Sequence, residues 1–287
     1  NKMVLAGLSN QYQLTNGLSH FVLVQGSYVD FENPFITNFE NRFESNYALR
    51  THFNYEKNWN NVSAEWRLGY EGATNPIYIK NYDNNSGIEG NPQNFDKLRN
   101  NSGFYVLSQK LNFNERLFTD ISISLNSNAY KWEKIFPTSE TGNVKFKDQW
   151  LPNFGMTYVL DKGFSVRGKI GKGNSAPTNE EIRSSNQQFN FHLVPEYGWN
   201  KEIGVRKQFG NTVFVELNYF DFRMKDAIVR RQNEAGQEYF VNQGNTVQKG
   251  WEFLLESKRF DLKNAVLSHF KFRFSGSIYD FKFKNYA

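Results

Sequence analysis

The sequence contains no cysteine among its 287 residues. This absence excludes disulfides, thiolate catalysis and cysteine-based zinc sites. The chain also lacks any run approaching the ~20 apolar residues that a transmembrane helix requires, which excludes a helical membrane protein. Its net charge is only +5, from 34 basic and 29 acidic residues, and the absence of a basic block argues against nucleic acid as a partner.

Signatures of catalysis are missing as well. The chain has no G-x-S-x-G elbow and no glycine-rich loop that would cradle a phosphate. The four histidines are scattered without the spacing of metal ligands: His20, His52, His192 and His269. We therefore predict no catalytic residues, no metal site and no cofactor, and we predict that the protein is not an enzyme.

About twelve segments alternate apolar and polar residues at every second position, which is the period of a β-strand. None shows the 3.6-residue period of a helix. Residues 62–71 show the alternation most cleanly, with Val62, Ala64, Trp66, Leu68 and Tyr70 on one face and Ser63, Glu65, Arg67, Gly69 and Glu71 on the other. The predicted strands lie at about 4–14, 18–29, 47–57, 62–71, 102–113, 117–128, 151–160, 164–170, 198–209, 212–224, 247–260 and 270–278.

The links between these segments are short and long in turn. The short ones carry the Asn, Asp and Gly residues of tight hairpins: 15–17, 58–61, 114–116, 161–163 and 210–211. The long ones lie at roughly 30–44, 73–101, 132–150, 172–197 and 225–246. In an up-and-down antiparallel sheet, this puts all tight turns at one end and all long loops at the other. That asymmetry is typical of a transmembrane β-barrel of the outer membrane, with periplasmic turns and extracellular loops.

The composition fits such a barrel. Aromatic residues make up 17% of the chain, and they suit the girdles at the two membrane interfaces. The mean hydropathy of −0.68 is no objection, because only half of each strand faces lipid. A soluble β-sandwich with an aromatic core stays open as an alternative. The polar faces carry charges of both signs, which fit a plugged lumen at least as well as an ion-selective pore.

Four stretches in the second half of the chain follow one another in an order and spacing that resembles a known family. They are residues 173–182 (GNSAPTNEEI), 193–204 (LVPEYGWNKEIG), 218–228 (NYFDFRMKDAI) and 239–252 (YFVNQGNTVQKGWE). Together they resemble the TonB-dependent outer-membrane receptors, and the receptors of iron complexes and siderophores in particular. The first half of the chain resembles the family only in its general pattern of strands.

The resemblance implies an all-β, 22-stranded transmembrane barrel in the cell outer membrane, with an N-terminal plug domain. Residues 1–287 would form a partial transmembrane β-barrel domain, about twelve strands of that barrel, with the plug and the final strands not present. We also expect the N-terminus to be missing or processed, since no signal peptide precedes Asn1. The implied partners are the inner-membrane TonB energy-coupling complex, reached through the missing plug segment, and a ferric chelate or similar small ligand. Lipid and lipopolysaccharide would surround the barrel, and a surface lipoprotein is a further candidate partner.

The function implied by the resemblance is energised uptake of a scarce ligand, such as an iron–siderophore or related chelate. A passive porin-like channel, or a barrel scaffold subunit of a surface complex, is the alternative. Aromatic and arginine side chains on the long loops suit flat or anionic chelates, although each is also explained as an ordinary solvated loop residue. The candidate ligand-binding residues are Tyr78, Tyr82, Arg183, His192, Arg230 and Arg231.

Overall fold

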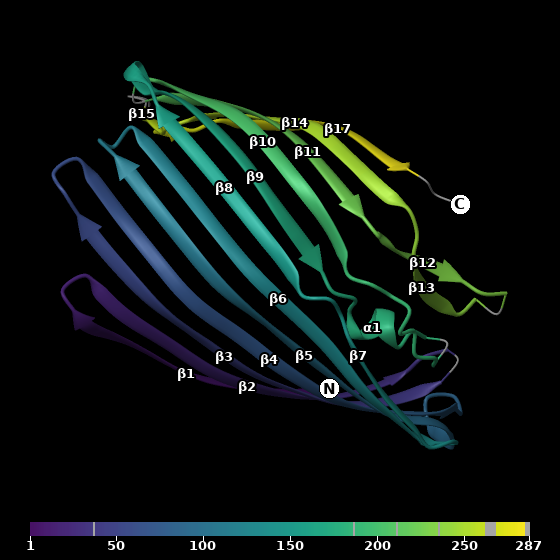
Figure 1. The fold of residues 1–287 in the computed structure, drawn as a ribbon. Coiled ribbons are helices and arrows are strands. Elements are labelled where there is room, and N and C mark those ends of the chain that lie inside the picture. The colour runs from purple at the N-terminus through teal and green to yellow at the C-terminus, as the bar shows by residue number, and fades with distance from the viewer. Residues whose placement is uncertain (37, 186, 211, 235, 262–267, 285–287) are drawn as a thin grey trace.

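The alternating segments pair into one long antiparallel sheet that curves around a concave side (Figure 1). The structure is a computed structural model, and it describes residues 1–287 except 37, 186, 211, 235, 262–267 and 285–287. The path of neighbouring strands is β1-β2-β3-β4-β5-β6-β8-β9-β10-β11-β14-β17, and β7 pairs with β6 beside this path. Within the described chain, β1 and β17 are the two edges, so the sheet is a barrel wall that is not closed.

The strands between residues 18 and 136 are the longest, and the strands of the main sheet before and after them are shorter. The strands of the main sheet are β1 (Lys2–Thr15), β2 (Leu18–Pro34), β3 (Phe39–Asn58), β4 (Val62–Asn84), β5 (Glu89–Phe113), β6 (Leu117–Phe136), β7 (Glu140–Lys145), β8 (Gln149–Val159), β9 (Phe164–Ser175), β10 (Glu196–Phe209), β11 (Val213–Lys225), β14 (Asn245–Ser257) and β17 (Arg273–Lys284). Two small hairpins are β12 (Ile228–Gln232) with β13 (Glu238–Asn242), and β15 (Phe260–Asp261) with β16 (His269–Phe270). The helical turns are η1 (Asp161–Gly163) and α1 (Asn179–Ile182). No helix in the described part of the chain is both long and apolar enough to cross a membrane.

The prediction of an all-β, up-and-down sheet is confirmed. The twelve strands of the main path correspond to the twelve predicted segments, and every neighbouring pair on the path is antiparallel. Alternation identified these strands because one face of each strand meets an apolar medium and the other a polar one. We call the end with the tight turns the turn side and the opposite end the loop side.

The prediction of long loops at 30–44 and 73–101 is wrong. The β2–β3 ladder continues to the pair Pro34↔Phe39, and the β4–β5 ladder continues to Asn84↔Glu89. An antiparallel ladder satisfies backbone N–H and C=O groups in water as well as in lipid, so the strands need not stop where the membrane does. The links at 172–197 and 225–246 do leave the main sheet: the first holds the segment with α1 and the second holds the β12–β13 hairpin.

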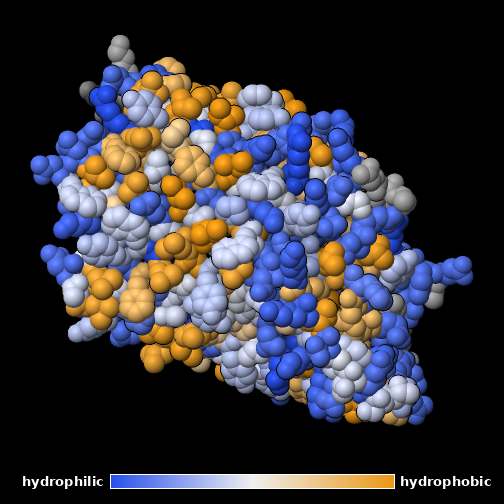
Figure 2. Space-filling model, in the orientation of Figure 1, coloured by the Kyte–Doolittle hydropathy of each residue, from blue (hydrophilic) through white to orange (hydrophobic). Residues whose placement is uncertain are grey.

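An apolar belt covers the outward face of the sheet on the turn side. Leu68, Leu107 and Ile123 are direct cross-strand neighbours in β4, β5 and β6, and they remain 58%, 54% and 39% exposed. A soluble monomer rarely exposes so continuous an apolar surface, whereas lipid would cover it. Figure 2 shows hydrophobic residues gathered over the strands toward the turn side, while hydrophilic residues predominate toward the loop side.

The same strands reverse their polarity on the loop side. The inward face of β4 carries Glu65 and Arg67 near its turn, but Ile77 and Ile79 farther along, and both isoleucines are buried. Leu98 of β5, paired with Ile77, and Trp132 of β6, paired with Leu98, continue this apolar row inward. The resulting core also contains Tyr130, Phe146, Ile182 and Leu193. Ile182 and Leu193 belong to residues 176–195, so this segment is what covers the inward face.

Candidate functional site

Residues 176–195, which we call the inner loop, cross the concave side of the sheet. The loop leaves β9 and returns to β10, yet it contacts β3, β4 and β5, which β6 and β8 separate from β9 in the sheet (Figure 1). Its α1 turn begins with a capping box at Thr178. The Thr178 N–H donates to Glu181 Oε2 at 2.7 Å, and the Glu181 N–H donates to Thr178 Oγ1 at 3.2 Å. This cap fixes the start of α1, and the residues that follow it continue across the concave side of the sheet.

Arg183, at the end of α1, is the main polar contact between the inner loop and the sheet. Its Nε donates to Asp96 Oδ2 of β5 at 2.7 Å, and its Nη2 donates to Asn81 Oδ1 of β4 at 2.7 Å. The side chains of Arg183 and Asp96 are only 4% and 1% exposed. Because removing either partner would leave a buried charge without compensation, this pair fixes where the loop sits.

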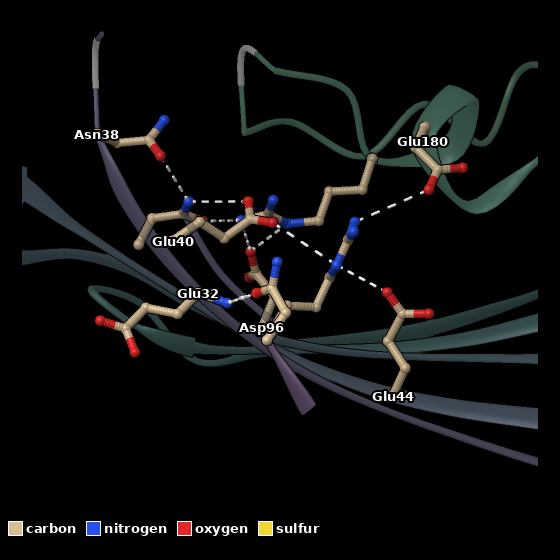
Figure 3. A network of polar contacts seen from close by, with 10 residues as sticks. Glu32, Asn38, Glu40, Glu44, Asp96 and Glu180 are labelled. Carbon is tan, nitrogen blue, oxygen red and sulfur yellow. Dashed lines mark hydrogen bonds and ion pairs between the residues drawn. The ribbon is translucent and has the colours of Figure 1, made fainter. Parts of the chain in front are cut away.

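The ion pair belongs to a larger polar network that extends to β3 (Figure 3). Asn81 Nδ2 donates to Asn38 Oδ1 at 3.2 Å and to Glu40 Oε2 at 3.1 Å. The amide of Asn81 therefore joins three segments that are distant in the sequence. Figure 3 shows Asn38, Glu40 and Asp96 directed toward this one network.

A second arginine, Arg42 of β3, bridges from the sheet to α1. Its Nε lies 2.8 Å from Glu44 Oε1 and its Nη1 lies 3.8 Å from Glu180 Oε1 of α1. Glu180 is largely exposed, so this longer contact is weak. The inner loop is thus held mainly by its buried contacts and only secondarily by the surface pair.

Burial controls the protonation of Asp96. Loss of hydration raises the pKa of the Asp96 carboxyl above its ordinary value, and the neighbouring Arg183 guanidinium offsets part of that rise. The second oxygen, Oδ1, is buried and has no hydrogen-bond partner among the described residues. Charge burial and charge attraction therefore oppose each other, and the pair contributes more to the position of the loop than to net stability.

A hydroxyl and a set of aromatic rings complete the contact with β6. Tyr130 is fully buried; its hydroxyl donates to the carbonyl of Pro177 and accepts from Asn100 Nδ2 at 3.0 Å. Beyond it, the Trp132 ring stacks with Phe189 and Phe191 of the inner loop, with centroid distances of 5.3 and 4.9 Å. These rings form a partly exposed aromatic stack on the loop side, which is a surface suited to flat ligands.

The β12–β13 hairpin braces the inner loop from the other side. Asn190 Nδ2 donates to the Phe240 carbonyl at 2.7 Å. Asn242 forms two bonds with Val194, accepting from its N–H at 2.8 Å and donating to its carbonyl at 2.9 Å. Loop and hairpin are therefore one connected unit at the loop side of the sheet.

The inward face at the turn side is charged and open. A recess of about 700 Å³ there includes four acidic and three basic side chains: Glu56, Glu65, Asp120 and Glu202 with Lys110, Arg167 and Lys169. Many of the inward charges are paired within the wall, as in Arg67 with Glu65 at 2.9 Å and Arg167 with Glu216 at 2.7 Å. This wall is polar without a strong excess of either sign.

The predicted ligand-binding residues fall into three places. Tyr78 and Tyr82 project from the outward face of β4, away from the inner loop, where Tyr82 packs against Phe95. Arg183 is buried in the ion pair with Asp96. His192 is exposed on the inner loop.

The third place is the β12–β13 hairpin, which carries the two remaining candidates. Arg230 forms an ion pair with Glu238 at 2.8 Å, and Arg231 contacts Gln243. The structure therefore does not gather the six residues into one site, and ligand capture by any of them stays a prediction. Sequence reasoning missed Asp96, Asn81, Trp132, Phe189 and Phe191. The pairs of apolar residues at 77 and 79, and at 189 and 191, were the available signal, because they mark faces that a second segment must cover.

Metal ligands are not grouped anywhere in the described chain. No three side chains of His, Asp or Glu there come together in a way that could hold a metal ion.

The sequence and the fold match known proteins. A family model described as TonB dependent receptor-like, beta-barrel matches residues 2–287. Among curated proteins, none matches the sequence. The ferric yersiniabactin uptake receptor FyuA from Yersinia pestis is similar in structure, with a TM-score of 0.73 and 13% identity, over 99% of this chain and 43% of that one.

Two further solved structures show the same fold. The ferric citrate transporter FecA in its unliganded form has a TM-score of 0.76 and 13% identity, over 99% of this chain and 43% of that one. The copper transporter OprC has a TM-score of 0.64 and 12% identity, over 88% of this chain and 44% of that one. The chain therefore spans less than half the length of these proteins.

Proposed function

Because the chain belongs to the TonB-dependent receptor-like β-barrel family, we propose that it forms part of the wall of an active-transport receptor that takes up a scarce ligand. The family is one of outer-membrane receptors, which confirms the predictions of a membrane barrel and of a protein that is not an enzyme. The observation that carries the proposal is the inner loop, because a barrel wall with a segment fixed across its concave side has a narrowed mouth on the loop side.

The proposed ligand is an iron–siderophore or a related metal chelate. Two of the similar proteins are named for ferric yersiniabactin and ferric citrate, and a third for copper. In this chain, the partly exposed stack of Trp132, Phe189 and Phe191 offers ring faces to a flat ligand. Exposed His192 and Arg230 lie on the two segments that form the mouth, and they are the candidate residues best placed to meet an anionic chelate.

The charged wall at the turn side supports a plugged rather than an open lumen. Its carboxylates and cations are mixed, so it can pair with the polar surface of a second domain, whereas an ion-selective channel uses rings of one sign. The partner in this proposal is a plug domain, which would connect the receptor to the TonB energy-coupling complex of the inner membrane.

Uptake by cells tests the proposal. A strain that lacks the complete receptor is expected to lose growth on at least one ferric chelate under iron limitation, and to regain it when the gene is restored. Growth should be lost again when the TonB complex is inactivated. Uptake that persists without the TonB complex would favour the passive channel, and unchanged growth on every metal chelate supplied would contradict the receptor.

The ligand surface has its own test. Replacing Phe191 with Ala removes one ring of the stack and is expected to weaken chelate binding by roughly 2- to 10-fold, in line with the ~0.5–1.5 kcal/mol typical of an aromatic pair. Tyr105→Ala, on the outward face of β5, is the matched control that should leave chelate affinity unchanged.

A further inference from the structure

Strand β7 has an outer side, which we call the free edge, that no strand of the described chain pairs with; its other side pairs with β6. A row of unpaired backbone N–H and C=O groups is a template for an added strand, and proteins normally cover such edges. The outer side of β13 is covered in this way. Asn190 Nδ2 donates to the Phe240 carbonyl at 2.7 Å, and the Glu238 N–H donates to Ser185 Oγ at 2.9 Å.

The hydrogen bonds of the β6–β7 ladder show which backbone groups face the free edge. The Phe146 N–H donates to the Asn128 carbonyl at 3.0 Å, which extends this ladder by one pair. Antiparallel residues bond their partner at every second position, so the even-numbered residues of β7 direct their backbone groups to β6. The odd-numbered residues direct theirs to the free edge, and all of them are exposed: Thr141, Asn143 and Lys145.

A proline explains why β9 does not cover this edge. The β8–β9 ladder ends at the pair Asn153↔Gly171. By the alternation along β6, Leu151 and Asn153 bond β6, so the next N–H directed at β9 would belong to residue 152. That residue is Pro152, which has no N–H, and the ladder ends there. Farther toward the loop side, β9 pairs with β10 alone among the described strands.

The free edge stands above the hydrocarbon of the membrane. Tyr70 and Tyr105, with ring centroids 4.8 Å apart, mark the loop-side edge of the apolar belt. Arg99 is six residues farther along β5 than Tyr105, about 20 Å along the strand at ~3.3 Å per residue. A strand tilt of ~45° converts this to about 14 Å along the membrane normal. Asn143 lies in the same row as Arg99, with Lys131 between them, so a segment from the cell exterior can reach the edge.

The outward face beside the free edge has an excess of positive charge. Arg99 lies directly opposite Lys131 of β6, and Lys131 lies opposite Asn143. Within the part of the chain that the structure describes, no carboxylate forms an ion pair with either cation, whereas Lys145 has one with Asp148 at 3.6 Å. A recess of about 720 Å³ borders both cations and Asn143. Carboxylates on the outward face of an added strand would therefore meet unpaired cations.

The inward face beside the same edge is apolar. Val144 packs against the core under the inner loop. A side chain at Gly142 would collide with the Trp132 ring, so this ring lies directly against β7. Phe191 stacks on Trp132 with a centroid distance of 4.9 Å. Apolar side chains on the inward face of an added strand would extend this cluster.

We propose that the free edge of β7 binds an extended segment of a partner protein at the cell surface, paired antiparallel to β7. Acidic residues of that segment face outward, and they alternate with apolar residues that face inward. The edge supplies the main-chain hydrogen bonds, and its two faces supply the sequence preference. A second copy of this chain fits less well, because its own unpaired cations would meet those of the first.

Binding of a synthetic peptide to the complete receptor in detergent tests this proposal. The probe is a fluorescent peptide as long as β7 in which glutamate and valine alternate, and fluorescence anisotropy gives its affinity. Asn143→Pro removes one N–H of the free edge and leaves the bonds to β6 in place. It is expected to weaken binding about fivefold, as follows from the loss of one backbone hydrogen bond. Asn143→Ala keeps this N–H and should bind like wild type.

Methylated peptides give the same test without any change in the receptor. In the antiparallel pairing, the glutamates lie opposite the odd-numbered residues of β7, so the glutamate N–H groups donate to the free edge. Methylating these amides should abolish binding, whereas methylating the valine amides should leave it nearly unchanged. If the glutamate amides are not the more sensitive set, the proposed pairing is wrong.

The charge preference has separate arms. Lysine in place of glutamate in the peptide should weaken binding by roughly tenfold, because like charges then meet. Lys131→Gln should weaken binding of the glutamate peptide about threefold. Lys57→Gln, on the outward face at the turn side, is the matched control that should keep wild-type affinity. Equal binding of the two peptides would overturn the acidic partner.

Hydrogen exchange distinguishes the other occupants of the edge. The Asn143 amide should exchange rapidly in the complete receptor and become protected when the peptide is added. Protection without peptide, from a second copy or from another part of the complete chain, would overturn the proposal. So would equal peptide affinity of the Asn143→Pro and Asn143→Ala receptors. None of these outcomes depends on chelate uptake.

Discussion

The turn-side and loop-side halves of β4, β5 and β6 have opposite polarity. On the turn side, Leu107 faces outward and Ser108 inward; on the loop side, Arg99 faces outward and Leu98 inward. The ladder is continuous across the reversal, so the backbone does not distinguish the halves. What differs is the medium on each face. On the turn side, lipid covers the outward face and water covers the inward face. On the loop side, water covers the outward face and the inner loop covers the inward face. The direction of burial in a strand therefore depends on what covers it.

The largest effect should come from breaking the ion pair that holds the inner loop. Asp96→Ala leaves Arg183 buried without its partner and is expected to cost about 3–5 kcal/mol in loop docking. The rate of protease cleavage within the inner loop of the complete receptor measures this. Asp96→Leu combined with Arg183→Met should recover most of the protection, since the pair is replaced by apolar contacts. If the Asp96→Ala receptor were as resistant to the protease as wild type, Arg183 would not be the residue that holds the inner loop in place.

The second test places one charge on the two faces of the turn-side half. Leu107→Arg puts a cation into the lipid belt and is expected to lower the free energy of unfolding by about 2–4 kcal/mol. Ser122→Arg puts the same side chain on the wet inward face of β6, where its direct neighbours Ser108 and Asn153 are uncharged and the cost should be small. Guanidinium titrations of the receptor in lipid vesicles provide the comparison. Similar costs at both positions would show that the faces are assigned incorrectly.

A third test compares two tyrosines, one from each half. Tyr130→Phe removes the hydroxyl that bonds to Pro177 and Asn100, and should destabilise the buried contact by about 1–3 kcal/mol. Tyr105→Phe, at the exposed edge of the belt, should change stability by less than ~0.5 kcal/mol. Hydrogen exchange of the inner-loop amides measures the first, and vesicle unfolding the second. An unchanged exchange rate in Tyr130→Phe would contradict the buried bond.

The smallest expected effect concerns how the inner loop begins. Thr178→Ala removes the side-chain acceptor of the capping box and should destabilise the docked loop by about 1 kcal/mol. Thr178→Ser keeps the acceptor and should behave like wild type. Hydrogen exchange at Glu181, whose N–H donates to Thr178, follows the local change. Equal exchange in the Ala and Ser variants would mean that the cap does not hold α1.

Sequence reasoning located the strands in the membrane belt and failed beyond it. Residues 62–71 alternate with lipid on one side, so their period is strong and β4 was identified there. Residues 77–79 also alternate, but with the apolar residues inward, and the segment was predicted as loop. The contacts of the candidate site were also missed by sequence reasoning. Arg183 was identified as a loop arginine, whereas its partner Asp96 is 87 residues earlier in the chain and carries no local signal.

Local pattern determined the fold class, the twelve main strands, the tight turns and the membrane character of this protein, because each depends on residues within one strand or one hairpin. Tertiary structure alone decided which segment crosses the concave side, which face of β4–β6 is apolar above the belt, and which charges are paired. Those features depend on contacts between residues far apart in the chain. The inner loop reverses the polarity of strands that precede it by about a hundred residues, and only the curvature of the sheet brings the two together.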